Sequence, residues 1–245
     1  MTITPEQRAA YEKLSASMVA EALEITRQTQ SKVEWEDRGT VNGARAFSAQ
    51  TPGSPITLVK GVVEIEIDDI DDVVREFMEA VTAEKLAAAI SQVDNQFREC
   101  DVLGLVDLVP GKDGATATSK TSLEWTCFSA PPIYPRDFCW LAHQRTTQDE
   151  GRTVFLSVCN SVERDECPDY WPTRSLVRGL IRNSGYVFRA TARPNVWQLS
   201  YLVQIDPKGI VPAFLANFVA KDQAGLAGRM RDVIVQRQTA KRKAA

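Results

Sequence analysis

Residues 135–162 read PRDFCWLAHQRTTQDEGRTVFLSVCNSV, and the periodicity of this stretch sets the fold class. Segments 137–147 and 152–163 are rich in aromatic and β-branched residues, and a short polar turn separates them, which is typical of two antiparallel strands. Further strand-like segments are at 95–109, 116–128, 175–182, 185–192 and 196–205. Consecutive strands with such short connections form an antiparallel meander, because a parallel sheet needs helices between its strands.

On the N-terminal side of the meander, the sequence predicts one long helix, three strands and two short helices. The apolar residues of segment 5–28 fall on one helix face: Tyr11, Leu14, Met18, Ala22 and Ile25. The strands are expected at 33–35, 44–50 and 56–67, with TPGSP (51–55) as a turn. The short helices are expected at 68–80 and 82–91, where acidic residues and Thr82 suit the helix N-termini.

A last helix is predicted over residues 212–238. Its apolar residues form one stripe: Phe214, Leu215, Phe218, Val219, Leu226, Met230, Val233 and Ile234. The tail TAKRKAA is expected to fray. The fold class is therefore α+β, a strongly curved antiparallel sheet that the last helix closes. Any space left between sheet and helix is expected to be an apolar cavity of the size of a lipid.

The composition excludes several kinds of catalytic site. The 245 residues fit one domain. They contain a single histidine, His143, so a metal centre built on two or three histidines is impossible. No phosphate-binding glycine loop or nucleophile elbow is present, and five cysteines without a Cys-x-x-Cys pair favour buried, reduced thiols. With neither a membrane-spanning apolar run nor a secretory leader, the protein is expected to be cytoplasmic.

The net charge of −3 conceals a strong asymmetry along the chain. Residues 171–245 contain 13 Lys or Arg and three acids, a charge of +10, so the first 170 residues carry −13. Such an asymmetry can steer one end of a protein toward an anionic surface, either phospholipid or nucleic acid. The alternative is that the two parts neutralise each other in the fold.

A series of motifs follows the order and spacing of a known family. They are PRDFCWL (135–141), SVERDECP (161–168), LVRGLI (176–181), SGYVFR (184–189), IDPKGIVP (205–212) and NFVAKDQ (217–223). Together they resemble the START domains, the StAR-related lipid-transfer domains. The resemblance implies a helix-grip fold, an internal lipid cavity with the last helix as its lid, and transfer or sensing of one lipid without a metal or organic cofactor. We therefore expect residues 1–29 to be a helix of the same domain, 30–238 the lipid-binding domain and 239–245 a flexible basic tail.

The resemblance also implies which residues contact the lipid. In sterol-binding members an acid and an arginine face each other in the cavity. Counted without gaps from the PRDF motif, these positions are Leu123 and Ala142 here, which weakens a sterol assignment. In phosphatidylcholine-transfer members an aromatic cage binds choline, as cation–π attraction predicts. Trp125 and Phe138 match that cage, with Arg182 in place of a further aromatic residue.

Two more positions match the phosphatidylcholine site. Asp94 matches an acid, whereas Ile90 replaces the arginine that holds the lipid phosphate, a charge that Arg182 can supply from another strand. The expected ligand-binding residues also include Trp140, Phe214 and Phe218. A polar two-chain lipid, glycerophospholipid or ceramide-like, is favoured over a sterol. The alternatives are core packing for the aromatic residues, a surface ion pair for Arg182 and a turn for Asp94.

An enzyme is the first alternative to a lipid carrier, because related helix-grip proteins include cyclases and hydrolases of small hydrophobic substrates. Proton transfer needs titratable groups in the cavity. The expected inward residues offer none: Leu123, Trp125, Phe138, Trp140 and Ala142. His143 is expected to point outward, one position past Ala142, so no catalytic residue, metal or cofactor is predicted. A second alternative is a protein that senses lipid without carrying it.

Lipid is expected to enter beside the loop SAPPIYP, residues 129–135. Its three prolines stiffen the loop, and Ile133 with Tyr134 offers an apolar side chain and an amphipathic ring suited to a bilayer surface. The alternative is a rigid turn packed inward. Lys241, Arg242 and Lys243 are expected to contact anionic lipid. The predicted partners are one lipid and, transiently, an anionic membrane, with no nucleic acid; the protein is expected to be a monomer that is peripheral at membranes.

Overall fold

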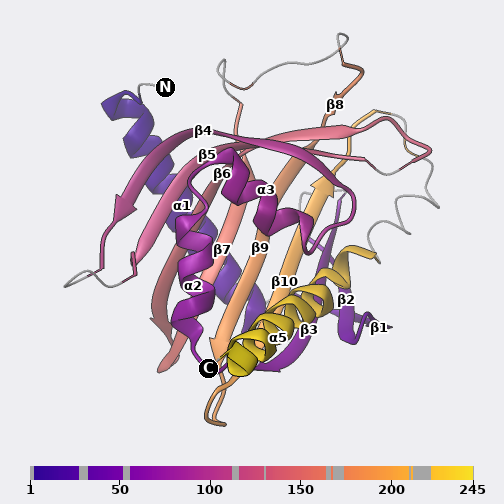
Figure 1. The fold of residues 1–245 in the computed structure, drawn as a ribbon. Coiled ribbons are helices and arrows are strands. Elements are labelled where there is room, and N and C mark those ends of the chain that lie inside the picture. The colour runs from indigo at the N-terminus through magenta and orange to yellow at the C-terminus, as the bar shows by residue number, and fades with distance from the viewer. Residues whose placement is uncertain are drawn as a thin grey trace.

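A computed structural model describes one strongly curved sheet with helices on both faces (Figure 1). The described residues are 3–27, 33–51, 56–111, 116–129, 131–163, 167, 174–209, 211 and 222–244. The strand order is β1-β2-β3-β10-β9-β7-β6-β5-β4, and neighbours along this path are antiparallel. Short β8 pairs in parallel with β6. The predicted antiparallel meander and α+β class are confirmed.

The strands run through most of the chain. Their bounds are β1 Glu36–Val41, β2 Ala44–Gln50, β3 Thr57–Glu66, β4 Phe97–Val109, β5 Ser119–Phe128, β6 Arg136–Asp149, β7 Arg152–Ser161, β8 Val177–Arg178, β9 Leu180–Ala190 and β10 Val196–Asp206. Two of these differ from the predictions. The segments 175–182 and 185–192 were expected to be two strands, but β9 runs without a break through Gly185, where φ is 143°. The first strand begins at Glu36 instead of including 33–35.

Helix α1 (Pro5–Thr26) covers the convex face of the sheet, behind β6, β7 and β9 in Figure 1. A capping box between Thr4 and Gln7 stabilises its start. The predicted apolar face is confirmed, because Tyr11, Met18 and Ala22 pack with outward residues of the strands in one buried cluster. This helix therefore shields the back of the sheet and takes no part in the concave side.

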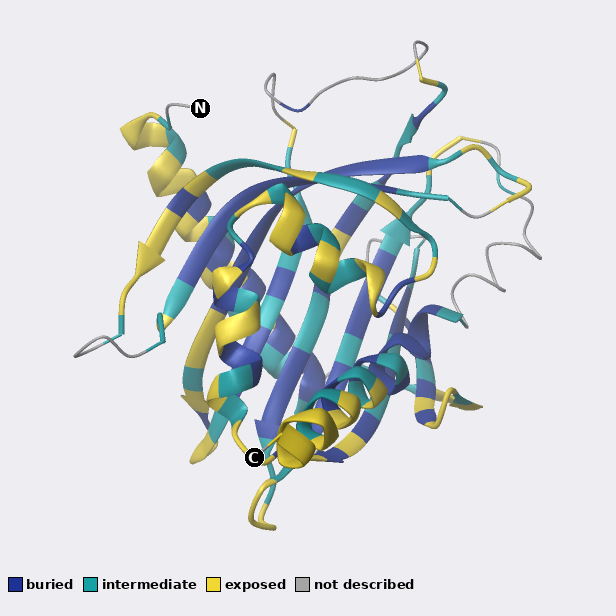
Figure 2. Cartoon of the chain, in the orientation of Figure 1, coloured by how far each residue is buried: buried dark blue, intermediate teal, exposed yellow. Residues whose placement is uncertain are grey.

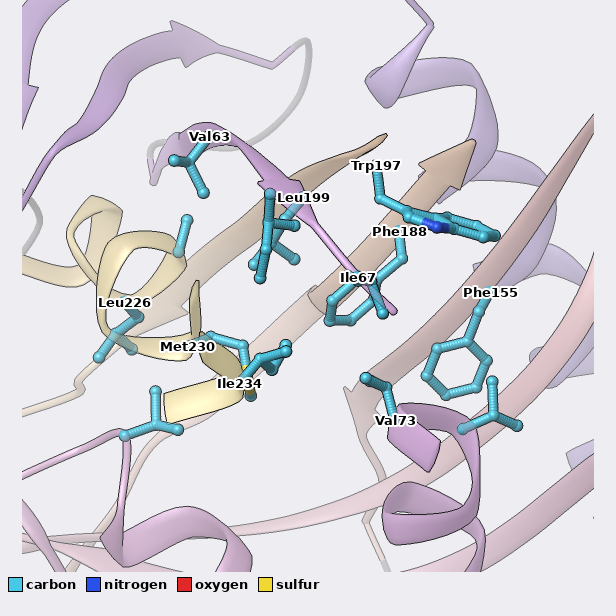
Figure 3. Close-up of a cluster of buried hydrophobic side chains, with 14 of the residues drawn as sticks. Val63, Ile67, Val73, Phe155, Phe188, Trp197, Leu199, Leu226, Met230 and Ile234 are labelled. Atoms are coloured by element: carbon cyan, nitrogen blue, oxygen red, sulfur yellow. The ribbon is translucent and has the colours of Figure 1, made fainter. Parts of the chain in front are cut away.

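Helices α2 (Ile70–Glu79), α3 (Ala83–Ser91) and α5 (Leu226–Ala244) lie over the concave face. Figure 2 shows that their outward faces are exposed, while the strands behind them are largely buried. Residues of α2 and α5 share one apolar cluster with inward residues of the strands, among them Phe155, Phe188 and Leu199 (Figure 3). Gly61 of β3 permits a close approach to the chain just before α5, since a Cβ there would lie 1.9 Å from the carbonyl oxygen of Ala224.

The C-terminal helix differs from its prediction. Helix α5 continues to Ala244, so residues 239–244 are helical and the expectation of a frayed tail is wrong. Ion pairs with the start of α2 hold this end in place, as described below. The predicted helical residues 212–221 and the turn residues 52–55 lie outside the described residues.

The cysteines also correct a prediction. Cys139 of β6 and Cys167 form a disulfide, with 6.0 Å between their Cα atoms, whereas Cys100, Cys127 and Cys159 are free thiols. The expectation that all five thiols are reduced is therefore wrong. No local pattern indicated this pair, because 28 residues separate the two cysteines along the chain. In the part of the chain that the structure describes, none of the helices is both long and apolar enough to cross a bilayer.

Candidate ligand cavity

A cavity of about 320 Å³ lies between the concave face of the sheet and helices α2, α3 and α5. Its wall is mainly apolar, with residues such as Val59, Phe77, Ile90, Val203 and Met230 contributed by every one of these elements. The volume is at the lower end of the range for ligand pockets in proteins. The space that the sequence predicted between the sheet and the last helix is therefore present.

Strand β6 supplies one wall of the cavity with Phe138, Trp140 and Ala142. Because side chains alternate along a strand, these three residues face the same way. The rings of Phe138 and Trp140 stack with centroids 6.2 Å apart, and Phe128 of β5 packs edge-on against Phe138 at 6.0 Å. The prediction that these β6 residues line the cavity is confirmed, whereas their contact with a ligand stays a prediction.

The two expected residues of β5, Leu123 and Trp125, face away from the cavity. Leu123 packs with Cys139 and Cys167 on the opposite side of the sheet. The indole nitrogen of Trp125 donates a hydrogen bond to Asp137 Oδ2 at 2.8 Å. The expectation that both residues face inward is therefore wrong, and the reason is the register: Leu123 pairs with Leu141 and Trp125 with Cys139, which are outward residues of β6.

Glu124 is the residue of β5 that faces the cavity at this level, opposite Trp140. Its carboxylate is buried, with the residue 3 % exposed. It accepts hydrogen bonds from Ser122 Oγ at 2.6 Å and from Trp140 Nε1 at 3.0 Å. Each oxygen has one donor among the described residues, and a carboxylate oxygen can accept two hydrogen bonds, so each oxygen can accept one more from a ligand. Sequence reasoning missed Glu124, although its pairing with Trp140 of the PRDF strand follows from the correct register.

Lys120 is a second charged residue in the wall, four residues before Glu124. Its ammonium donates hydrogen bonds to the carbonyl oxygens of Phe77 and Ala80, at 2.6 and 2.9 Å. These carbonyls end helix α2, where a positive charge is favourable. Burial lowers the pKa of Lys120. The lysine is thus committed to α2, but the argument that the cavity wall contains no titratable group is wrong.

Asp94 and Ile90 both line the cavity, as predicted. Asp94 follows α3, is 9 % exposed, and accepts a hydrogen bond from the backbone nitrogen of Gln96 at 2.9 Å. Burial raises the pKa of Asp94, and the hydrogen bond from Gln96 and the charge of Arg229 partly oppose this effect. Asp94 therefore has both of the roles considered for it. It is a turn residue whose side chain makes an Asx-type hydrogen bond, and it also belongs to the cavity wall.

Arg182 does not line the cavity, so its predicted role there is wrong. It is an exposed residue of β9, and with Asn183 and Gln204 it lines a separate polar pocket of about 500 Å³. Inward residues of β9 are Ile181, Ser184 and Tyr186. Phe214 and Phe218, two further predicted ligand contacts, lie outside the described residues.

The predicted membrane-contact residues fall into two groups. Ile133 lines the cavity, while the neighbouring Tyr134 is 61 % exposed, so the loop reaches from the cavity to the surface. Lys241 and Arg242 are exposed but paired, with Asp72 and Asp68 respectively. Lys243 is exposed.

His143 points away from the cavity, as predicted. Its Nδ1 and the hydroxyl of Thr121 share a hydrogen bond of 2.8 Å across β5 and β6. The ring is buried, and burial, aided by the charge of Arg145, lowers the pKa of His143 to about 4. Within the described ranges, no three His, Cys, Asp or Glu residues gather as metal ligands.

Comparisons with known proteins agree with this geometry. The family model described as START domain matches residues 90–241. The fold is similar to that of human StAR-related lipid transfer protein 5, with a TM-score of 0.68, 18 % identity, and coverage of 94 % of this chain and 99 % of that chain. Human STARD10 gives a TM-score of 0.58 at 14 % identity, covering 99 % of this chain and 84 % of its own.

The lipid transfer and protein localization domain of human StarD13 gives a TM-score of 0.56 at 21 % identity, covering 89 % and 95 % of the two chains. No curated protein matches the sequence. The family match extends over more than half of the chain, and it includes the PRDF strand, the cavity residues of β5 to β10 and most of helix α5. The chain belongs to the START domain family.

Proposed function

We propose that this START domain binds one lipid in the cavity and carries it between membranes. The observation that supports the proposal most strongly is the cavity itself, a mainly apolar space beneath α5. Transfer of a lipid chain from water into such an apolar space is favourable, because it buries the apolar surface of the chain. The similar human proteins whose names describe lipid transfer share only the fold with this chain, so they support the proposal without identifying the ligand.

The polar groups of the wall favour a neutral, hydroxyl- or amide-bearing head group. Glu124 can accept a hydrogen bond from such a donor, whereas a lipid phosphate beside this carboxylate would be repelled. The three cations of the described cavity wall already have partners: Lys120 donates to the carbonyls of Phe77 and Ala80, Arg136 donates to those of Pro207 and Lys208, and Arg237 pairs with Glu76. Arg182 lies outside the cavity. These groups therefore favour a ceramide-like lipid or a sterol over a glycerophospholipid. This proposal departs from the sequence-based preference, which placed both kinds of polar two-chain lipid ahead of sterols.

Membrane contact is proposed at the loop that contains Ile133 and Tyr134. Tyr134 is among the most exposed large apolar side chains described, and Ile133 reaches the cavity wall. A tyrosine ring suits the membrane–water interface. The loop therefore joins the bilayer surface to the ligand site, as transfer by a peripheral protein requires.

A transfer assay between two vesicle populations tests the proposal. Donor vesicles contain a fluorescent ceramide or a fluorescent sterol, and the protein should speed its arrival in acceptor vesicles. A lipid sensor would bind the same probe without speeding transfer. An enzyme would change the probe, which organic extraction and mass spectrometry of the vesicles would detect.

A further inference from the structure

A polar pocket of about 500 Å³ lies on the convex side of the sheet, the side that α1 covers (Figure 1). Glu21 of α1 belongs to its wall, together with Arg182 of β9 and Gln204 of β10, which pair in the sheet. Val203 and Ile205, the neighbours of Gln204, line the ligand cavity instead. Because side chains alternate along a strand, the two spaces lie on opposite faces. We call this second space the outer pocket.

A β-bulge in β9 turns Asn183 toward the outer pocket. Asn183 and Ser184 lie opposite a single residue of β10, Val203, so β9 has one extra residue at this point. In a regular strand the residue after Arg182 would face the cavity, but Asn183 lines the outer pocket beside Arg182, and Ser184 lines the cavity. The backbone of Asn183 has a φ of 36°, a left-handed conformation that asparagine adopts more readily than most residues.

The side chain of Asn183 is buried and lacks a partner. The residue is 6 % exposed, and neither the oxygen nor the nitrogen of its carboxamide has a hydrogen-bond partner among the described residues. Only its backbone nitrogen is bonded, as a donor to Asn160 Oδ1 at 3.4 Å. A buried amide without a partner is costly and rare in native proteins. A ligand that reaches the bottom of the outer pocket can supply both the donor and the acceptor that this amide lacks.

The charged groups of the outer pocket favour a neutral ligand. Arg182 offers only donors, whereas Glu21 and Glu163 offer only acceptors. None of these three side chains forms an ion pair with another described residue. A simple anion would be repelled by two carboxylates, and a simple cation by the guanidinium. A hydroxyl group both donates and accepts, so a neutral molecule with several hydroxyls can pair with the guanidinium, the carboxylates and the amide together.

We propose that the outer pocket binds a small neutral polyhydroxylated molecule, such as a monosaccharide or a cyclitol, with Asn183 as its central contact. The carboxamide of Asn183 donates to one hydroxyl and accepts from another, and Arg182 donates to a third. Only Leu180 and Ile181 are apolar among the described residues of this wall, so a lipid chain would gain little there. Ile181 also borders the ligand cavity, but the polar contacts belong to the other face of the sheet. The inference therefore does not depend on the proposed lipid transfer.

NMR spectroscopy of the isotope-labelled protein tests the site, with D-glucose and myo-inositol as probes. Sugars stabilise many proteins because they are excluded from the surface, so a higher melting temperature alone would not show binding. We expect at least one probe to cause saturable shifts of the side-chain amide of Asn183 and the backbone amide of Arg182. The side-chain amide of Asn195, an exposed residue that does not line the outer pocket, should not shift in this way.

Two variants and a matched control identify the contacts. Asn183→Gly removes the carboxamide, and glycine tolerates the positive φ. It should weaken binding about tenfold or more, on the scale of two hydrogen bonds, and keep the melting temperature of the parent, because the amide has no partner to lose. Asn195→Gly changes another asparagine of positive φ, 58°, and should bind like the parent. Arg182→Gln changes an exposed residue, so it should fold normally and weaken binding about tenfold.

Inorganic phosphate and glycine are the comparison probes, an anion and a zwitterion. Saturation at Asn183 by either one at lower concentrations than by the polyols would overturn the assignment of a neutral ligand. If neither polyol causes saturable shifts at Asn183, the outer pocket holds only water and the inference is overturned. Equal binding by Asn183→Gly and Asn195→Gly, or parent-like binding by Arg182→Gln, would also overturn it. Lipid transfer by Arg182→Gln should equal that of the parent, so the two proposals can fail separately.

Discussion

The indole nitrogen of Trp140 donates a hydrogen bond to the carboxylate of Glu124 at 3.0 Å, across the pair of strands that forms the cavity wall. Ser122 donates to the second carboxylate oxygen. An acid is thus held in a fixed orientation within a mainly apolar wall. We expect this carboxylate to favour ligands that carry a hydrogen-bond donor. A ligand without a donor would cover the carboxylate and remove it from water without replacing the hydrogen bonds that water makes, which costs binding free energy.

Replacement of Glu124 by Gln should weaken binding of a hydroxyl-bearing lipid. The carboxamide keeps the side-chain volume but loses the charge that strengthens the hydrogen bond. We expect a loss of about 1.5 to 3 kcal/mol, the range for hydrogen bonds to charged groups, measured by titration with a fluorescent ceramide and a fluorescent sterol. Asp101→Asn, an exposed change on β4, is the control and should bind like the parent. Equal affinity of Glu124→Gln and the control would remove Glu124 from the ligand site.

Trp125 and Trp140 should respond differently to the same substitution. Trp125→Phe removes the hydrogen bond to Asp137 on the outer side of the sheet, so it should lower the free energy of unfolding by about 1 to 3 kcal/mol and leave lipid affinity unchanged. Trp140→Phe frees one oxygen of Glu124 inside the cavity and should change lipid affinity. Chemical denaturation and lipid titration of both variants check this. Loss of affinity in Trp125→Phe would contradict the outward placement of this residue.

His143 should make the protein less stable in mild acid. Burial lowers the pKa of His143 to about 4 in the fold, below its ordinary value of 6.5. Between these values the unfolded chain binds a proton that the folded chain does not, so stability is fully present above pH 6.5 and falls as the pH drops toward 4. The loss should reach about 3 kcal/mol.

His143→Gln isolates this effect, because no other histidine is present. Denaturation curves of parent and variant at several pH values should give a stability difference that changes between pH 6.5 and pH 4. A difference that stays constant over this interval would mean that His143 titrates alike in the folded and unfolded chains.

Tyr134→Asp should slow lipid transfer several-fold without releasing a bound lipid. The ring is exposed beside the cavity, and a carboxylate there disfavours the bilayer interface. Ile133 is left unchanged because it belongs to the cavity wall. Tyr134→Trp preserves an interfacial aromatic residue and should transfer lipid like the parent. Transfer by Tyr134→Asp at the parent rate would show that ligand exchange uses another route.

The sequence predicted the order of elements well, because periodicity and turns are local signals. It failed on the orientation of β5. Along this strand the apolar residues Leu123, Trp125 and Cys127 face outward, where they pack with residues such as Cys167 and Leu176. The polar residue Glu124 faces the cavity. The count without gaps from the PRDF motif, which matched Leu123 and Trp125 to cavity residues of the family, therefore assigned the wrong face of β5.

The partners of charged residues could not be predicted at all. The charge asymmetry of the chain left open whether its basic part attracts an anionic surface or neutralises the acidic part. Lys241 and Arg242 pair with Asp72 and Asp68, which are separated from them by 169 and 174 residues. Such contacts depend on how α5 crosses the sheet, and this crossing has no local signal in the sequence. For these residues the structure supports neutralisation within the fold.

Native mass spectrometry of the protein purified from cells, followed by organic extraction, tests lipid binding most directly. We expect one neutral, hydroxyl- or amide-bearing lipid per chain, with its occupancy reduced in Glu124→Gln and unchanged in Asp101→Asn. The same experiment on protein that has been delipidated and incubated with vesicles should restore the bound species. A chain that carries no lipid after either treatment would contradict the proposal that the cavity beneath α5 is a lipid site.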